Sequence, residues 1–378
     1  MLRVLVVEDS ATARRLLVML LNADPGIEVV GEARDGQEGV ALCKKLHPDL
    51  VTMDIQMPVM DGVEATRQIM VESATPIVMV SSLDPADIRR SMHALNAGAL
   101  AVLPKPSGPG TPRFERDVRE LIATIKAMAQ VKLVRRWSAA APPYRAGAGA
   151  GAGASTSTST STSTSTGTGT GTGTMAALRS PSGERRTVEV VGLVSSTGGP
   201  NVLRRILSEL PADFAPPILI VQHIAAGFAQ GLAEWLESTT HRSVKLATDG
   251  ERFVPGTVYV APDDRHLEVT RDGLVVSDAP PTDGFRPAGT RLFSSLASVF
   301  GRHAVGVILT GMGHDGVAGL AELRDAGGVV FAQDEASSDI FGMPGAAVEA
   351  GVVAETTPLA DIPARLVELV SREPAGGR

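Results

Sequence analysis

Val-Glu-Val-Val-Gly-Leu-Val-Ser-Ser-Thr-Gly-Gly-Pro, residues 188–200, is the stretch that decides the fold of the second half of this 378-residue chain. The apolar run over 188–194 is typical of a buried strand, and the hydroxyl- and glycine-rich turn with a proline is typical of a helix start. Similar apolar runs end at Gln222-His223 and at Gly311–Gly316. Strands that alternate with helices predict a doubly wound parallel sheet, where side chains following the strands can meet at one edge.

Three side chains at these strand ends have the chemistry of a serine hydrolase. Ser196, His223 and Asp315 could act as a nucleophile, a base and an acid that orients the base. Each also has a structural explanation. The turn at Ser196 can cap a helix or bind a phosphate, His223 can be a hydrogen-bonded core histidine, and Asp315 can cap the following helix. Only the three together favour catalysis.

The first half of the chain alternates strands and amphipathic helices in a second module. Apolar runs predict buried strands at 4–7, 27–33, 50–53, 76–80 and 99–103. This alternation predicts a five-stranded, doubly wound parallel sheet of the flavodoxin-like kind.

Polar side chains follow several strands of this first module. Glu8, Asp9 and Asp54 supply the oxygen ligands that Mg²⁺ prefers, and the metal would neutralise a phosphoryl group on Asp54. Ser81 and Lys105 would bind the oxygens of that phosphoryl group. Residues 1 to about 106 resemble the receiver domain of two-component response regulators on the strength of these five positions.

Composition separates the two modules. Residues 146–174 are Gly-Ala, Ser-Thr and Gly-Thr dipeptide repeats, which bury too little apolar surface to offset the entropy of ordering. We therefore predict a receiver domain over 1–110 with its last helix reaching about 130, a flexible linker over 138–186, and a catalytic domain over 187–375.

Charge and apolar patterning exclude several classes of protein. Residues 188–378 hold 14 Lys+Arg against 24 Asp+Glu, a net charge of −10, which argues against nucleic-acid binding. The single cysteine cannot form an internal disulfide, and no apolar run approaches the ~18 residues of a membrane span. We expect a cytoplasmic protein with no nucleic-acid partner and no membrane insertion.

The two modules together resemble the chemotaxis-specific protein-glutamate methylesterase/glutaminase family, over everything except the linker. The resemblance rests on the Ser-Thr-Gly-Gly turn, the Gln-His pair and the Gly-Met-Gly-x-Asp-Gly turn. It implies that Ser196 is the nucleophile, His223 the base and Asp315 the acid. It also implies that Met312 supplies an amide of the oxyanion hole.

The resemblance implies a function as well. Such enzymes hydrolyse glutamate γ-methyl esters, and deamidate glutamines, on methyl-accepting chemotaxis receptors. A chemotaxis histidine kinase phosphorylates and thereby activates them. We expect Mg²⁺ for phosphorylation and no metal or cofactor for ester hydrolysis. The alternative is a receiver-controlled module that binds a nucleotide or phosphate, although its glycine-rich turn lacks the G-x-G-x-x-G spacing and a Walker lysine.

One dipeptide departs from the family pattern. Val194-Ser195 stands where the family usually has Gly-Ala, so a second hydroxyl adjoins Ser196. Successive side chains of an extended segment point opposite ways, and we expect only one hydroxyl to face the site.

Short apolar runs later in the chain predict antiparallel structure. We expect 256–262 and 266–269 to form a hairpin, with 274–276 as a third strand. The loop 280–287 is expected at the rim of the substrate site. His266 either lines the cleft or flanks a turn.

Overall fold

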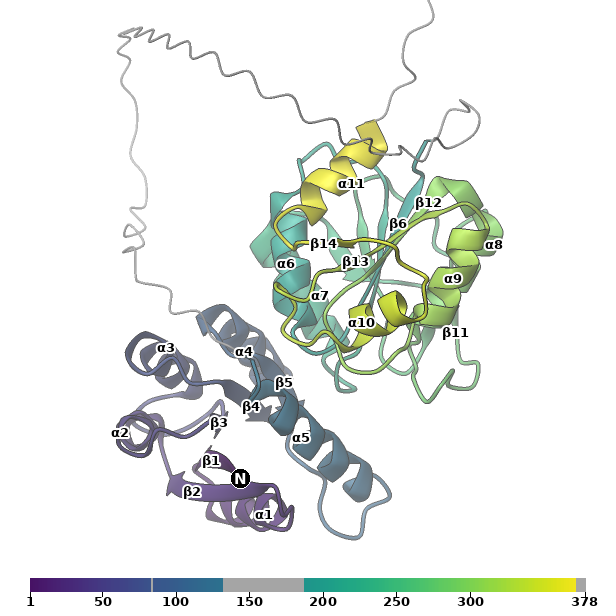
Figure 1. The fold of residues 1–378 in the computed structure, drawn as a ribbon. Helices are drawn as coiled ribbons and strands as arrows, with labels where there is room; N and C mark the ends of the chain where they lie inside the picture. Colours follow the sequence, from purple (N-terminus) through teal and green to yellow (C-terminus); the bar gives the residue numbers. More distant parts are fainter. Residues whose placement is uncertain (83, 132–186, 372–378) are drawn as a thin grey trace, which may run out of the picture. The chain divides into compact units, whose positions relative to one another are not determined.

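The computed structural model describes residues 1–82, 84–131 and 187–371, whose helices and strands make two α/β domains (Figure 1). The predicted linker over 138–186 and the last residues of the predicted catalytic domain, 372–375, lie outside the described residues. Each domain contains its own parallel sheet with helices between most of the successive strands, which confirms the predicted fold class.

The N-terminal domain contains a five-stranded parallel sheet with the strand order β2-β1-β3-β4-β5. The strands are β1 (Leu2–Val7), β2 (Ile27–Ala33), β3 (Leu50–Met53), β4 (Ile77–Ser81) and β5 (Ala101–Pro104). The helices are α1 (Ala11–Asn22), α2 (Gly36–Leu46), α3 (Gly62–Glu72), α4 (Pro85–Ala97) and α5 (Phe114–Met128). The order reverses between β1 and β3, so the residues that follow these strands lie at a topological switch point, where ligands bind in such sheets.

Aspartates begin two of these helices. The Asp35 carboxylate accepts a hydrogen bond from the Glu38 amide at 2.9 Å, and the Asp61 carboxylate accepts one from the Glu64 amide at 2.8 Å. These side chains satisfy amides that have no partner within the first turn of a helix.

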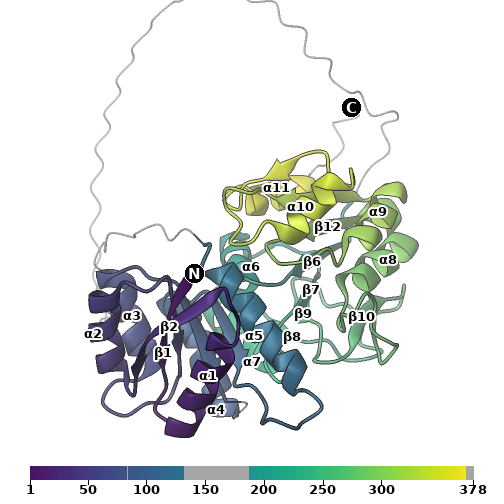
Figure 2. The ribbon, with the colours of Figure 1, turned by 60° about the horizontal axis from the view of Figure 1, so that its bottom comes forward.

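The C-terminal domain is built on a seven-stranded parallel sheet with the order β14-β13-β12-β6-β7-β9-β8. Its strands are β6 (Val190–Ser195), β7 (Ile218–Gln222), β8 (Val244–Leu246), β9 (Val258–Val260), β12 (Ala304–Ile308), β13 (Val329–Gln333) and β14 (Thr356–Thr357). Its helices are α6 (Gly199–Glu209), α7 (Ala229–Thr240), α8 (Gly289–Val299), α9 (Val317–Asp325), α10 (Gly342–Glu349) and α11 (Ile362–Ser371). Helices α8 and α9 lie side by side in both views (Figures 1 and 2).

Central strand β6 is buried along its whole length between β7 and β12. Its Gly192 pairs with Gly306 of β12. A Cβ atom on Gly192 would come within 2.7 Å of Leu296 Cδ1, a side chain of α8. The absence of a side chain at this position therefore allows α8 to pack closely on the sheet.

The predicted antiparallel hairpin is present, but the sequence placed it wrongly. Strand β9 pairs in parallel with both β7 and β8, so it has no free edge for residues 266–269. The hairpin instead joins β10 (His266–Val269) to β11 (Leu274–Ser277), the segment that we expected to be a third strand. Its turn is closed by a hydrogen bond from the Thr270 amide to the Gly273 carbonyl at 2.9 Å.

None of the helices in the described residues is long and apolar enough to cross a lipid bilayer.

Candidate functional site

Strand register brings three sequence-distant turns to one edge of the C-terminal sheet. Ser195 is level with Gln222 in the β6–β7 pair, and Val194 is level with Ile308 in the β6–β12 pair. The residues that follow these positions therefore leave the sheet together. The Ser196 amide also donates to the Thr310 carbonyl at 3.0 Å, which ties the first turn to the third.

His223 and Asp315 form a close polar pair at this edge. His223 Nε2 lies 2.8 Å from Asp315 Oδ2, and the Asp315 side chain is completely buried. The His223 Nδ1 atom is also buried and has no hydrogen-bond partner within the described residues. The imidazole is thus held through one nitrogen and has the other available.

Two amides at the start of α8 also hold the Asp315 carboxylate. Gly289 and Thr290 donate to it, at 2.5 and 3.1 Å. Burial alone would raise the pKa of Asp315, but the hydrogen bonds from His223, Gly289 and Thr290 outweigh burial and lower that pKa. Asp315 therefore carries its charge at neutral pH beside the positive end of a helix dipole. It does not cap the helix that follows it, because the N-cap of α9 is Gly316 without a side-chain bond.

Ser196 lines a hollow, and His223, Phe285, Met312 and Gly313 are among the other residues of the C-terminal domain that line it. Ser196 Oγ makes no hydrogen bond within the described residues, so none joins it to His223. Such bonds are often long or absent before substrate binds. The Met312 amide likewise has no acceptor in the described part of the chain, although Gly311 beside it bonds through both its amide and its carbonyl.

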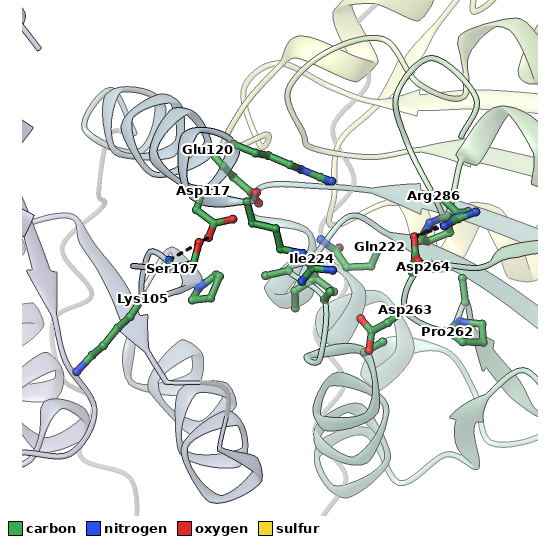
Figure 3. A pocket seen from close by; sticks show the side chains of 18 of the residues that line it. Lys105, Ser107, Asp117, Glu120, Gln222, Ile224, Pro262, Asp263, Asp264 and Arg286 are labelled. Atoms are coloured by element: carbon green, nitrogen blue, oxygen red, sulfur yellow. Dashed lines mark hydrogen bonds and ion pairs between the residues drawn. The ribbon is translucent and has the colours of Figure 1, made fainter. Parts of the chain in front are cut away.

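The predicted rim loop contributes an aromatic side chain that sequence reasoning did not single out. The Phe285 ring stacks on the His223 imidazole with ring centroids 4.4 Å apart and an angle of 16° between the ring planes. The neighbouring Arg286 is fixed against Asp264 by hydrogen bonds of 2.8 Å (Figure 3). Phe285 was recognisable only as the one aromatic residue in a loop of prolines and polar residues.

His266 is a structural histidine rather than part of the hollow. It is completely buried, its Nδ1 accepts from the Ala288 amide at 3.2 Å, and its Nε2 lies 3.1 Å from the Pro280 carbonyl. Both contacts fasten the ends of the rim loop to the hairpin strand β10.

Two further residues, Thr310 and Gln333, hold the turn that contains Ser196, and neither was identified from the sequence. The Thr310 hydroxyl donates to the Thr197 carbonyl at 3.0 Å and accepts from the Ile340 amide at 2.9 Å. The Thr310 amide donates to Gln333 Oε1 at 3.0 Å. Gln333 closes an apolar run just as Gln222 does, and that similarity was the available signal.

The acidic residues predicted in the N-terminal domain lie together. Ligand atoms of Glu8, Asp9 and Asp54 lie within 4.8 Å of one another. Glu8 Oε2 is buried and lies 2.9 Å from the Lys105 ammonium. Three carboxylates whose oxygens converge in this way fit a divalent cation that takes oxygen ligands, such as Mg²⁺.

Lys105 completes this cluster. Its Nζ donates to Glu8 Oε1 and to Asp54 Oδ2, both at 2.9 Å. Burial, followed by the charge of Asp54, raises the pKa of Glu8 to about 7. Burial also raises the pKa of Asp54, against the opposing effect of Lys105. Ser81 is buried at the end of β4, and the Lys105 amide donates to its carbonyl at 2.7 Å.

Comparison with known proteins covers both domains. Residues 4–111 match the family model of the response regulator receiver domain, and residues 191–366 match that of the CheB methylesterase. The chain is 52% identical over 370 residues to protein-glutamate methylesterase/protein-glutamine glutaminase 4 of Myxococcus xanthus, covering 97% of this chain and 96% of the relative. The chain belongs to this family.

Two further similarities concern the same family. Protein-glutamate methylesterase/protein-glutamine glutaminase 3 of Anaeromyxobacter dehalogenans is 51% identical over 357 residues, covering 93% of this chain and 94% of the relative. The solved catalytic domain of the Thermotoga maritima CheB methylesterase is 38% identical, with a TM-score of 0.47; the match covers 49% of this chain and 100% of that one. The ranges of the two family models identify the five-stranded domain as the receiver domain and the seven-stranded domain as the methylesterase domain. The alternative of a nucleotide-binding output module is not favoured.

Proposed function

We propose that this protein is a phosphorylation-activated protein-glutamate methylesterase and protein-glutamine glutaminase. Its substrates are glutamate γ-methyl esters, and specific glutamines, on methyl-accepting chemotaxis receptors. The observation that carries the proposal is the buried Asp315 carboxylate, which lies 2.8 Å from His223 in the same hollow that Ser196 lines. Relatives that match nearly the whole chain bear the names of this activity.

The reaction is acyl transfer to Ser196. Its Oγ attacks the γ-carbonyl carbon, and His223 Nδ1 takes the hydroxyl proton because Nε2 is engaged by Asp315. Asp315 stabilises the imidazolium that results. The proton then passes to the departing methoxide, methanol leaves, and water hydrolyses the acyl-enzyme by the reverse sequence of proton transfers.

In this mechanism the Met312 amide donates a hydrogen bond to the oxyanion of the tetrahedral intermediate. It has no acceptor within the described residues and belongs to the lining of the hollow. A preorganised donor of this kind typically contributes about 10²–10³ in rate. Phe285 covers one face of the imidazole and keeps it oriented while its charge changes.

The receiver domain supplies the control. We propose that Asp54 accepts a phosphoryl group from a chemotaxis histidine kinase, that Glu8, Asp9 and Asp54 hold Mg²⁺, and that Ser81 and Lys105 bind the phosphate. Bound Mg²⁺ neutralises the charge of the incoming phosphoryl group. The proximity of the three carboxylates and the bonds from Lys105 support these roles.

The domain boundaries are part of the proposal. The receiver spans 1–110 with α5 continuing to Met128, and the methylesterase domain spans 187–375, with 138–186 as a connector. The matched ranges 4–111 and 191–366 support these limits.

The decisive experiment measures methanol release from methylated receptor, with and without a small-molecule phosphodonor and Mg²⁺. We expect release that the phosphodonor stimulates and that Ser196→Ala abolishes. Undiminished release from Ser196→Ala would remove the proposed nucleophile. No release from the unaltered protein, together with a rise in melting temperature on adding nucleotide, would favour the nucleotide-binding alternative.

A further inference from the structure

A buried pair of polar side chains joins the ends of β6 and β7 directly beneath the proposed nucleophile and base. Ser195 is completely buried, and its hydroxyl donates to Gln222 Oε1 at 2.6 Å. Gln222 Nε2 donates to the carbonyls of Ser196 and His223, both at 2.7 Å. The side-chain amide of Gln222 thus bonds to the backbone of both the proposed nucleophile and the proposed base.

We propose that Gln222 is a positioning residue that fixes Ser196 relative to His223, and that Ser195 holds Gln222 in the orientation this requires. The inference rests on the roles proposed above for Ser196 and His223. It gives the second hydroxyl of the Ser-Ser pair a function of its own, distinct from nucleophilic attack.

The hydrogen-bond partners of the Gln222 side chain determine which way its amide group is oriented. Both donors of the NH₂ group are used on carbonyls, so rotating the amide by 180° would bring Oε1 against two acceptors. Gln222 Oε1 is buried in turn, and among the described residues only the Ser195 hydroxyl donates to it. Without that hydroxyl a buried acceptor is left unsatisfied, which favours conformations in which Gln222 leaves the two carbonyls.

Gly199, in the first turn of α6, provides an independent indication that this space is reserved for the pair. A Cβ atom on Gly199 would come within 2.0 Å of Gln222 Oε1 and 2.8 Å of Ser195 Oγ. The Gly199 amide also donates to the Ser196 carbonyl at 2.9 Å, so that carbonyl accepts from both sides. The nucleophile's backbone is therefore held by a helix amide and a side-chain amide together.

The consequence for catalysis is geometric. Ser196 and His223 make no direct hydrogen bond within the described residues, so their separation depends on the backbones that carry them. A displacement of about 1 Å between a nucleophile and its base can lower the rate about 100-fold. The Gln222 amide, which bonds to the backbones of both Ser196 and His223, opposes such a displacement.

A double-mutant cycle on the full chain tests the proposal, with methanol release from methylated receptor measured under saturating phosphodonor. Gln222→Met keeps the length of the side chain and removes its polar atoms; we expect kcat to fall about 30- to 100-fold with KM changed less than about twofold. Ser195→Ala should lower kcat about 5- to 10-fold. Because Ser195 acts through Gln222, the double variant should be no slower than Gln222→Met alone, within about twofold.

The contradicting outcomes are equally definite. If the two effects multiply in the double variant, or if Gln222→Met retains native kcat, the positioning role is wrong.

Thr240→Val is the matched control, because it removes another buried hydroxyl of the same domain, which donates to the Leu236 carbonyl in α7. We expect it to leave kcat unchanged.

Gln222→Glu adds a readout that a purely structural role would not alter. A carboxylate can accept from Ser195 but cannot donate to the carbonyls, whereas its protonated form can donate to one of them. The kcat of Gln222→Glu relative to the unaltered protein should therefore rise as the pH falls, and parallel pH profiles would overturn the proposal. Ser196→Ala is included in the series. If it remains active, the proposed role of Ser196 as nucleophile fails, whereas an inactive Ser196→Ala with multiplying effects in the cycle removes only the positioning role.

Discussion

At the scale of residues, the surroundings distinguish side chains that are chemically alike. Ser195 and Ser196 adjoin each other, yet Ser195 Oγ is buried and engaged by Gln222, whereas Ser196 lines the hollow with Oγ free of hydrogen bonds within the described residues. A hydroxyl that must attack a carbonyl needs access to it. This contrast supports Ser196 as the nucleophile.

Replacing each serine in turn measures this contrast. Ser196→Ala should lower methanol release by several orders of magnitude because it removes the attacking atom, whereas Ser195→Ala should retain a tenth or more of the rate. Steady-state release from methylated receptor gives both values, with far-UV circular dichroism as the check on folding. The opposite ranking would transfer the nucleophilic role to Ser195.

The His223–Asp315 pair gives the second prediction. His223→Ala should be as inactive as Ser196→Ala, and Asp315→Asn should lose about 10³–10⁴ in kcat because the imidazole loses the partner that orients it. The Gly289 and Thr290 amides bond to different oxygens of Asp315, and one of them can still donate to the single asparagine oxygen, so we expect Asp315→Asn to remain folded. Near-native turnover of Asp315→Asn would limit Asp315 to holding the start of α8.

Asp339, beside the nucleophile turn, gives a prediction about pH and stability. Burial raises the pKa of its carboxyl from 3.8 to about 6. Below about pH 3 the group is protonated in both the folded and the unfolded state, so it has no effect there. As the pH rises from about 3 to 6 the unfolded chain gains charge that the folded state resists, and stability is lost.

Asp339→Asn should therefore stabilise the protein above pH 6. With allowance for the residual exposure of this side chain, we expect the free energy of unfolding to rise by about 1–2 kcal/mol at pH 8, with no difference at about pH 3. Urea unfolding at the two pH values measures this. Equal stabilities at pH 8 would mean that the Asp339 carboxylate is well solvated.

At the scale of elements, positions in the sheet determine which segments can pair. The apolar run at 256–262 was correctly expected to be extended, but its partners are β7 and β8 rather than the next strand in sequence. Short antiparallel and parallel strands have the same local pattern, because pairing depends on which sheet edges are free. The β10–β11 hairpin follows the ordinary local rule, with a glycine at 273 in its turn.

The packing of α8 on β6 gives an element-scale prediction. Gly192→Val would place its Cβ 2.7 Å from Leu296 Cδ1 and 3.2 Å from Phe293 Cε1, and these buried side chains have little room to move. We expect a loss of about 1–3 kcal/mol in stability from overpacking, with a larger loss in activity because α8 carries the amides that hold Asp315. Chemical unfolding together with kcat measures both. Val71→Ala, an exposed position of the receiver, is the control for a neutral apolar change.

At the scale of the whole molecule, one chain combines a receiver and a methylesterase, and the relatives that match nearly its full length share this combination. The receiver holds carboxylates and a lysine in one cluster. We propose that its role in this chain is control of the other domain. A tenfold change in active population requires only about 1.4 kcal/mol of differential interaction.

Asp54→Ala tests this control in the full chain. The substitution removes the proposed phosphoacceptor while leaving the methylesterase site unaltered, so we expect basal methanol release to persist and stimulation by phosphodonor and Mg²⁺ to disappear. Lys105→Ala should bind phosphate poorly and show weaker stimulation. Normal stimulation of Asp54→Ala would place the phosphoacceptor elsewhere.

The sequence by itself determined the class of both domains and the polar residues at the strand ends. Apolar runs such as 188–194 are local patterns, and residues that follow parallel strands must leave the same edge of a sheet. Tertiary structure alone decided which atoms meet. The Gly289 and Thr290 amides on Asp315, the Phe285 ring on His223 and the Gln222 amide between two carbonyls join residues distant along the chain. Such contacts depend on helix placement and side-chain rotamers, which packing fixes and local sequence does not.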